Sequence, residues 1–195
     1  NLIESRDGST GLHVKNTQNY VQILTKALRE KGMYPDILDH NYELNTVKAS
    51  VLHDIGKIKT PDAILLKPGR LTDEEFEVMK QHTVAGCEII DRIIGNVEHE
   101  EYVDIARKIA RYHHERWDGT GYPDGLSGEE IPLCARIMAL ADVFDALYQD
   151  RCYKKAIRPA SKVFEIIKEN SGSQFDPNLT EIFLELQRKI TDISE

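Results

Sequence analysis

Cysteine is scarce in this chain of 195 residues, which has three, Cys87, Cys134 and Cys152. Their odd number and wide spacing, without a CxxC pair, exclude a disulfide framework and a thiolate zinc site and favour a reducing cytoplasm. No apolar run approaches the roughly 18 residues that cross a bilayer, so we predict a cytoplasmic domain without membrane insertion. Lys and Arg (25) are outnumbered by Asp and Glu (33), for a formal net charge of −8, and form no stripe. This charge pattern argues against a surface for duplex DNA.

The chain also lacks an initiating Met, since it begins at Asn1, and it shows no signal peptide. No repeat of about 20 to 50 residues and no low-complexity tract interrupts it, which argues against a solenoid. Its length suits one domain that can bury roughly 70% of its unfolded surface. We therefore expect residues 1–195 to form a single domain, the output domain of a longer signalling protein.

Residues that begin and end helices recur along the chain, whereas the signals typical of strands and hairpins do not. Apolar residues recur at helical spacing between caps, glycines and prolines. The predicted helices cover about 14–32, 44–53, 72–95, 103–113 and 132–147, and two more open at Pro159 and at Asp176–Pro177. Thr72 and Glu75 have the spacing of a capping box, and Pro132 suits a first helical turn. The sequence therefore predicts an all-α fold, a bundle of about seven helices.

An imidazole and a carboxylate stand side by side at His53 and Asp54, at the end of the second predicted helix. A carboxylate can bridge two cations, whereas a neutral imidazole offers one nitrogen, so Asp54 is the natural shared ligand of a two-metal site. Asp142 lies in the apolar run 137–144, where an unpaired carboxylate would cost several kcal/mol, so it needs a cation or strong hydrogen bonds. We expect Asp145, three residues later, to support a ligand or cap a backbone group.

Four further histidines are candidate ligands: His13, His82, His113 and His114. A single helical histidine is more often a satisfied or half-exposed side chain than a ligand. The whole set beside Asp54 and Asp142 favours a metal site. His40 and His99 stand in polar loop contexts, and we expect both to face solvent.

Five blocks of sequence follow one another in order. They are His53-Asp54 with Gly56-Lys57, Lys67-Pro-Gly-Arg-Leu-Thr72, His82-Thr83, His113-His-Glu-Arg-Trp-Asp-Gly-Thr-Gly-Tyr-Pro123 and Ala141-Asp-Val-Phe-Asp-Ala-Leu147. From about His13 to Asp176, the chain resembles the HD-GYP domains of the HD phosphohydrolase superfamily. The resemblance implies an all-α HD core and a metal-dependent phosphodiesterase. Its implied substrate is cyclic di-GMP, a bacterial second messenger, cleaved to linear pGpG, with further cleavage to GMP left open.

The resemblance also implies the full ligand set, with Asp54 bridging: His13, His53, Asp54, His82, His113, His114 and Asp142. Imidazole and carboxylate ligands without thiolate suit two divalent or mixed-valence metal ions, with iron favoured and manganese next. Family members with three metals have a Glu four residues before the first histidine, where this chain has Ser9. We therefore expect two metals and not three.

The dianionic substrate needs local positive charge in an acidic protein. We expect this charge from the metals and from three side chains: Lys57, Arg151 and Lys154. Lys57 should contact a phosphate oxygen and act with Asp54 in catalysis. The glycine-rich loop 115–131 is long enough for a binding loop, and its Tyr122 is a candidate substrate contact. Trp117, in the same loop, can stack on guanine or anchor the loop to the core.

Three other functions remain open from the sequence. The chain can be a weakly active signalling module that binds nucleotide or a partner protein, or a hydrolase of a mixed GMP–AMP cyclic dinucleotide. The third is a general nucleotidase acting on mononucleotides, which the Gly-Tyr-Pro loop makes less favoured. An upstream regulatory domain is expected as a partner in the full-length protein, and a homodimer is compatible with the sequence.

Overall fold

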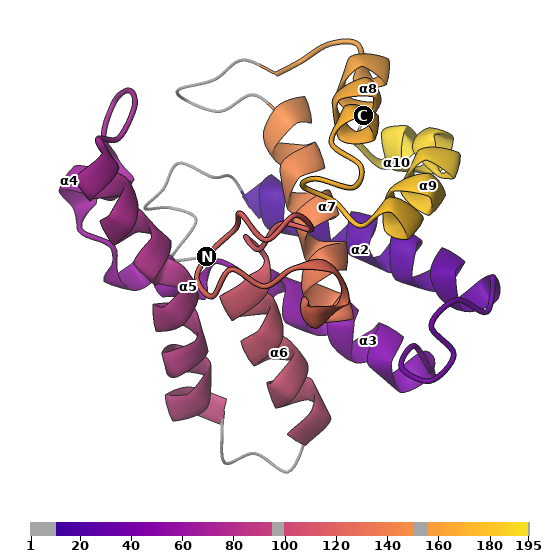
Figure 1. The fold of residues 1–195 in the computed structure, drawn as a ribbon, viewed down its shortest axis with the longest axis horizontal. Coiled ribbons are helices and arrows are strands. Elements are labelled where there is room, and N and C mark those ends of the chain that lie inside the picture. Colours follow the sequence, from indigo (N-terminus) through magenta and orange to yellow (C-terminus); the bar gives the residue numbers. More distant parts are fainter. Residues whose placement is uncertain (1–10, 95–99, 150–155, 195) are drawn as a thin grey trace.

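The computed structural model describes residues 11–94, 100–149 and 156–194, and these residues fold into a helical bundle (Figure 1). The α-helices of this part are α2 (Gly11–Glu30), α3 (His40–Ala49), α4 (Asp62–Leu65), α5 (Asp73–Ile94), α6 (Glu100–Tyr112), α7 (Leu133–Tyr148), α8 (Ala160–Glu169), α9 (Pro177–Glu185) and α10 (Gln187–Ser194). Three short 3₁₀ turns join them: η1 (Ser50–Leu52), η2 (Ile55–Lys59) and η3 (Gly128–Glu130). The predicted all-α fold is confirmed.

The seven predicted helices correspond to α2, α3 and α5 to α9, while α4 and α10 were not predicted. The two additional helices have 4 and 8 residues. Such lengths give one or two turns, too few for an apolar period to stand out from its surroundings. The expected count of about seven is therefore low for the described residues.

Helix α7 lies in the centre of the bundle and is surrounded by other helices (Figure 1). It contacts α2, α6, α8 and α9. Its Phe144 ring packs edge-on against Tyr20 of α2, with the ring centroids 5.2 Å apart, and lies 4.9 Å from the ring of Phe164 on α8. Burying each such aromatic side chain stabilises the fold by about 2 to 3 kcal/mol. This packing fixes the position of α7 and of the acidic residues that it carries.

Helices α5 and α6 form a second unit, with η2 packed against α5 (Figure 1). Gly56 makes this approach possible, because a Cβ atom there would lie 1.8 Å from the carbonyl oxygen of His82 and 2.5 Å from the amide nitrogen of Gly86. No side chain fits into such a gap without moving the backbone. The glycine therefore holds the segment after Asp54 directly against the turn of α5 that carries His82.

The second predicted helix differs from the structure at both ends. Helix α3 begins at His40, where the side chain of Asp39 accepts a hydrogen bond from the Tyr42 amide, and it ends at Ala49. The chain then tightens into η1, because the carbonyl of Ser50 accepts from both the backbone and the ring nitrogen of His53. His53 thus follows a 3₁₀ turn and not an α-helix. His40 is exposed as expected, although it begins a helix, and His99 lies outside the described residues.

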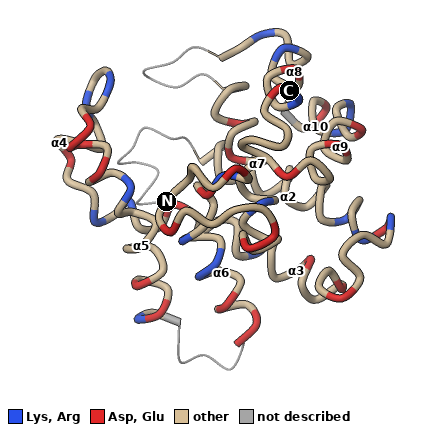
Figure 2. The backbone as a smooth tube through the Cα atoms, viewed as in Figure 1, with Lys and Arg blue, Asp and Glu red and all other residues tan. Residues whose placement is uncertain are grey.

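Acidic and basic residues are interspersed over the described elements (Figure 2). Several form ion pairs between neighbouring helices, such as Arg107 with Asp91 across α6 and α5. Within the residues that the structure describes, no helix has both the length and the hydropathy that a membrane span requires.

Replacing Gly56 should destabilise the fold more than replacing its neighbour Gly86. A Cβ at Gly86 would meet the Ala110 Cβ at 3.2 Å, and the better helix propensity of Ala offsets that contact. We expect Gly56→Ala to lower the free energy of unfolding by about 3 kcal/mol, and Gly86→Ala to change it by less than about 1 kcal/mol. Urea unfolding followed by circular dichroism measures both values. Equal losses would contradict the close approach at Gly56.

Candidate metal centre

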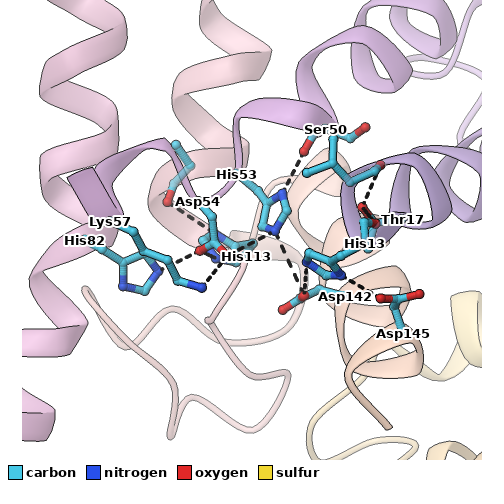
Figure 3. A network of polar contacts seen from close by, with 12 residues as sticks. His13, Thr17, Ser50, His53, Asp54, Lys57, His82, His113, Asp142 and Asp145 are labelled. Carbon is cyan, nitrogen blue, oxygen red and sulfur yellow. Dashed lines mark hydrogen bonds and ion pairs between the residues drawn. The ribbon is translucent and has the colours of Figure 1, made fainter. Parts of the chain in front are cut away.

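All seven predicted ligands converge on one site between the helices, and Figure 3 shows all of them except His114 with labels. They come from five parts of the chain: His13 from α2, His53 and Asp54 from the junction of η1 and η2, His82 from α5, His113 and His114 from the segment after α6, and Asp142 from α7. The most distant of them in sequence, His13 and Asp142, approach to 3.5 Å between Nε2 and Oδ1. The packing of α2, α5, α6 and α7 thus gathers residues that are far apart along the chain.

The ligand atoms form two groups that share Asp54. In the first group, the ligand atoms of Asp54, His82, His113 and His114 lie within 4.8 Å of one another. In the second, those of His13, His53 and Asp54 lie within the same distance. Asp142 adjoins the second group, since its Oδ1 is 3.5 Å from Nε2 of His13 and 4.0 Å from Nε2 of His53.

The two oxygens of Asp54 face different groups. Oδ1 lies 3.3 Å from Nε2 of His82 and 3.6 Å from Nε2 of His113. Oδ2 lies 3.3 Å from Nε2 of His53. A carboxylate placed in this way can offer one oxygen to each of two cations.

Four of the histidine rings are oriented by a hydrogen bond at Nδ1. The acceptors are Asp145 Oδ2 for His13 (2.6 Å), Ser50 O for His53 (2.8 Å), Met79 O for His82 (2.7 Å) and Ile109 O for His113 (2.9 Å). A carbonyl or carboxylate oxygen only accepts, so Nδ1 carries the hydrogen and Nε2 keeps its lone pair in the neutral ring. Carbonyl or carboxylate acceptors of this kind are the usual supports of metal-bound imidazoles.

Four atoms directed into the cluster lack hydrogen-bond partners. Within the described residues, Nε2 of His53, His82 and His113 and Oδ1 of Asp54 are buried without one. An unsatisfied buried polar atom costs about 1 to 3 kcal/mol. Lone pairs of three imidazole nitrogens and one carboxylate oxygen that converge in this way suit a divalent cation, so the residues present fit a metal.

Burial and neighbouring charges set the protonation of the cluster. Burial lowers the pKa of His82 to about 4, and burial, aided by His113 and His82, lowers the pKa of His114 well below its usual value. Both rings are therefore neutral at pH 7, as ligands must be. Burial raises the pKa of Asp54, but Lys57 and His53 outweigh it and hold that pKa well below the usual range.

His53 shows the opposite balance. Burial lowers its pKa, yet the charges of Asp54 and Asp142 outweigh burial and raise the pKa above the usual value. The position between two carboxylates therefore attracts positive charge, which a proton or a metal ion can supply.

Lys57 lies beside the shared carboxylate. Its Nζ is 2.6 Å from Oδ2 of Asp54, three residues earlier, and its side chain is 17% exposed. The ammonium group therefore reaches the edge of the cluster (Figure 3).

As expected, Asp145 supports one of the predicted ligands. Its Oδ2 accepts from Nδ1 of His13, and its Oδ1 accepts from Nδ2 of Asn16 at 3.1 Å. Asp145 itself is buried and lies behind the His13 ring, away from the shared carboxylate. Sequence reasoning did not find Asn16, which lies three residues after His13 on the same face of α2.

The glycine-rich loop covers the histidine doublet. The ring of Tyr122 lies 4.9 Å from that of His114, and the loop can fold this tightly because a Cβ at Gly121 would be 2.4 Å from the amide nitrogen of Arg116. The Trp117 amide donates to the carbonyl of Gln174, and the Arg136 guanidinium lies 5.8 Å from the Trp117 ring. These contacts favour the anchoring interpretation of Trp117.

Glu115 is the residue of this loop that sequence reasoning missed. Its buried carboxylate accepts three backbone hydrogen bonds, from Asp124 at 2.7 Å and from Gly125 and Leu126 at 3.1 Å. A signal was present, because the glycine-rich loop leaves amide groups that need acceptors and Glu115 directly follows the histidine doublet. Glu115 ties the loop to the ligands.

Three predicted residues lie outside the described part of the chain: Ser9, Arg151 and Lys154. The contribution of Arg151 and Lys154 to substrate binding, and that of Ser9 to the number of metals, stay predictions.

Comparison with known proteins agrees with this geometry. The HD domain family matches residues 11–179. A cyclic di-GMP phosphodiesterase of Vibrio cholerae is 47% identical over 196 residues, which cover 99% of this chain and 39% of that protein. A 3'3'-cGAMP-specific phosphodiesterase 2 of the same species is 37% identical over 185 residues, covering 95% of this chain and 33% of the relative. The chain thus spans about two fifths of the length of the curated relatives it matches.

A solved structure shares the fold. Bd1817, a HDG"Y"P protein from Bdellovibrio bacteriovorus, superposes with a TM-score of 0.62 at 17% identity, covering 88% of this chain and 51% of that chain. At such an identity the likeness concerns the fold alone. The family match over residues 11–179 shows that the chain belongs to the HD domain family, and the five sequence blocks give it its resemblance to the HD-GYP type.

Proposed function

We propose that this domain is a metal-dependent phosphodiesterase that hydrolyses cyclic di-GMP to linear pGpG. The observation that carries the proposal is the pair of ligand groups that share Asp54. A shared carboxylate can hold two cations close together, and two such cations can stabilise both the attacking and the leaving oxygen in the hydrolysis of a phosphodiester. The name of the Vibrio cholerae relative at 47% identity supports the choice of substrate.

The described residues divide between two cations. Asp54, His82, His113 and His114 would hold one, and His13, His53, Asp54 and Asp142 would hold the other. Nitrogen and oxygen donors without thiolate suit iron or manganese, with zinc also possible, and the resemblance to HD-GYP domains favours iron. When bound, such cations make a coordinated water more acidic and neutralise charge on phosphoryl oxygens.

The protein's own side chains orient these ligands and bind the substrate. The carbonyls of Ser50, Met79 and Ile109 fix the imidazoles, so the rings need no reorganisation when charge develops. Lys57, already 2.6 Å from Asp54, would donate to a non-bridging phosphate oxygen. Tyr122 would contact the substrate from the loop, and Arg151 and Lys154 would add positive charge.

A mixed GMP–AMP cyclic dinucleotide is the second candidate substrate. It is favoured by one observation, the name of the relative that is 37% identical over 95% of this chain. The greater length of the relatives supports an additional regulatory domain in the full-length protein. We place the domain in the cytoplasm, where cyclic dinucleotides act as messengers.

The proposal is tested by metal content and product analysis together. The purified chain, loaded with iron or manganese, should bind two metal ions and convert cyclic di-GMP to pGpG, as measured by elemental analysis and chromatography. A fully loaded chain that leaves cyclic di-GMP and cyclic GMP–AMP intact would refute the proposal. Cleavage of the mixed dinucleotide alone would make it the substrate, and a third bound metal would refute the expectation drawn from Ser9.

Loss of Asp54 should release more metal than loss of a ligand in one group. Asp54→Ala removes oxygens that face both groups, whereas His82→Ala removes one nitrogen from the first group. We expect Asp54→Ala to lose both metal ions and His82→Ala to lose chiefly one. Elemental analysis of folded protein, with folding checked by circular dichroism, measures the difference. Equal retention in the two variants counts against a shared carboxylate.

Lys57 should serve catalysis without serving metal binding. A protonated ammonium group is no metal ligand, so Lys57→Ala should keep its metals and its fold. We expect the loss of one charge-assisted contact to lower kcat/KM by roughly 30-fold to 1,000-fold, which corresponds to about 2 to 4 kcal/mol. Steady-state kinetics on metal-matched proteins gives the value.

Lys59 provides the matched control for this variant. It lies two residues further along η2, where its exposed ammonium pairs with Glu88 at 2.7 Å. Lys59→Ala should change the rate less than about threefold, as for a solvated surface ion pair. If Lys57→Ala behaves like Lys59→Ala, Lys57 has no role at the site.

A further inference from the structure

A cavity of about 260 Å³ adjoins the histidine doublet. His113 and His114 form part of its wall, and Ala139 and Val143 of α7 form another part. Its other side chains come from α5, from the glycine-rich loop and from the segment before α9. A nucleotide whose phosphate lies at the cluster carries its base only one ribose away, so this cavity is placed to receive a base.

Two aromatic side chains give the cavity flat apolar walls. The rings of Phe76 and Tyr122 both line it, and they meet edge to face with their centroids 5.9 Å apart. Phe76 is 44% exposed, whereas the other four phenylalanines of the chain are buried. An exposed aromatic ring beside the metal ligands can be covered by a flat ligand, because nucleic-acid bases stack on aromatic side chains.

Positive charge lies close to these rings. Nζ of Lys80 is 5.4 Å from the centroid of Phe76 and 5.8 Å from that of Tyr122. This ammonium group, which also pairs with Glu77, thus lies beside the two aromatic rings that line the cavity.

The polar wall contains an arginine that is held in place. Nε of Arg116 donates to Oγ1 of Thr120 at 3.0 Å, and its Nη2 lies 3.4 Å from the carboxylate of Asp118. The side chain therefore pays less ordering entropy on binding than a free arginine would. Arginine pairs with O6 and N7 of guanine, whereas adenine presents an amino group at the equivalent of O6.

We infer that this cavity binds one guanine base of the substrate, stacked on the exposed ring of Phe76 beside Tyr122 and read by Arg116. The inference rests on the proposed function and adds the part of the substrate that is recognised. Guanine is common to cyclic di-GMP and cyclic GMP–AMP, so both dinucleotides can use this subsite. Cyclic di-AMP cannot satisfy Arg116 and is rejected.

Binding of simple nucleotides to the metal-loaded chain tests the aromatic walls. Isothermal titration calorimetry with GMP and with ribose 5-phosphate separates the base from the phosphate. We expect GMP to bind at least tenfold more tightly than ribose 5-phosphate. Phe76→Ala should lower the affinity for GMP at least fivefold, as expected for the loss of one stacking contact. Its affinity for ribose 5-phosphate should change less than twofold.

Val78→Ala is the matched control on the same helix. Val78 is 41% exposed and does not line this cavity, so its loss should change neither affinity. If Phe76→Ala lowers the affinity for both ligands equally, or for neither, Phe76 contacts no base and the inference is wrong.

The preference for GMP over AMP tests Arg116. Arg116→Lys keeps the charge but loses the planar fork, so the preference should fall at least tenfold. Arg111→Lys is the control, because Arg111 also bonds the loop, through Asp124, without lining the cavity. An unchanged preference in Arg116→Lys, or an equal fall in both variants, would overturn the reading of guanine by Arg116.

These measurements are independent of turnover. If no cyclic dinucleotide is hydrolysed while GMP binding still depends on Phe76, the proposed function fails and the guanine subsite stands. If cyclic di-GMP is hydrolysed while GMP and ribose 5-phosphate bind equally, the subsite fails and the proposed function stands.

Discussion

The site depends on how the buried carboxylate of Asp54 is compensated. Burying a carboxylate costs several kcal/mol unless opposite charge and hydrogen bonds surround it. Lys57 supplies one ammonium at 2.6 Å, but the nearest imidazole nitrogens, at 3.3 to 3.6 Å, present lone pairs toward the same oxygens. Lone pairs and a carboxylate repel one another. A cation between them turns this repulsion into attraction, and the raised pKa of His53 reflects the same demand met by a proton.

Local backbone geometry, more than long-range packing, orients the imidazoles. His53 and His82 bond to the carbonyl three residues earlier, and His113 to that four residues earlier. Each of these rings is therefore set by its own helical turn, and the close contact at Gly56 then brings two of the turns together. His13 differs, because Asp145, 132 residues away, holds it. The second ligand group thus depends on the packing of α2 against α7, whereas the first depends on η2, α5 and α6.

This division explains what the sequence could predict. Residue type and spacing identify candidate ligands, and the Thr72–Glu75 capping box forms as predicted, with the Thr72 amide 2.7 Å from the Glu75 carboxylate. Helix periodicity identified the long helices but not α4, which has too few residues to show a period. The 3₁₀ turn before His53 could not be predicted, because it depends on one carbonyl shared by a backbone and a ring nitrogen. The role of Glu115 arises only when the loop folds around it.

Glu115 connects the two halves of the proposed chemistry. It follows His114 directly in sequence, and its carboxylate holds the backbone of residues 124–126, so the loop that carries Tyr122 is fixed against the histidine doublet. The amide of Tyr122 also donates to the carbonyl of His114. The ligands and the aromatic wall therefore form one unit, and a displacement of either moves the other. Small errors in the position of a reacting phosphate reduce rates strongly. A base that fills the cavity would help to align the phosphate, because the loop that contacts the base is held against His114.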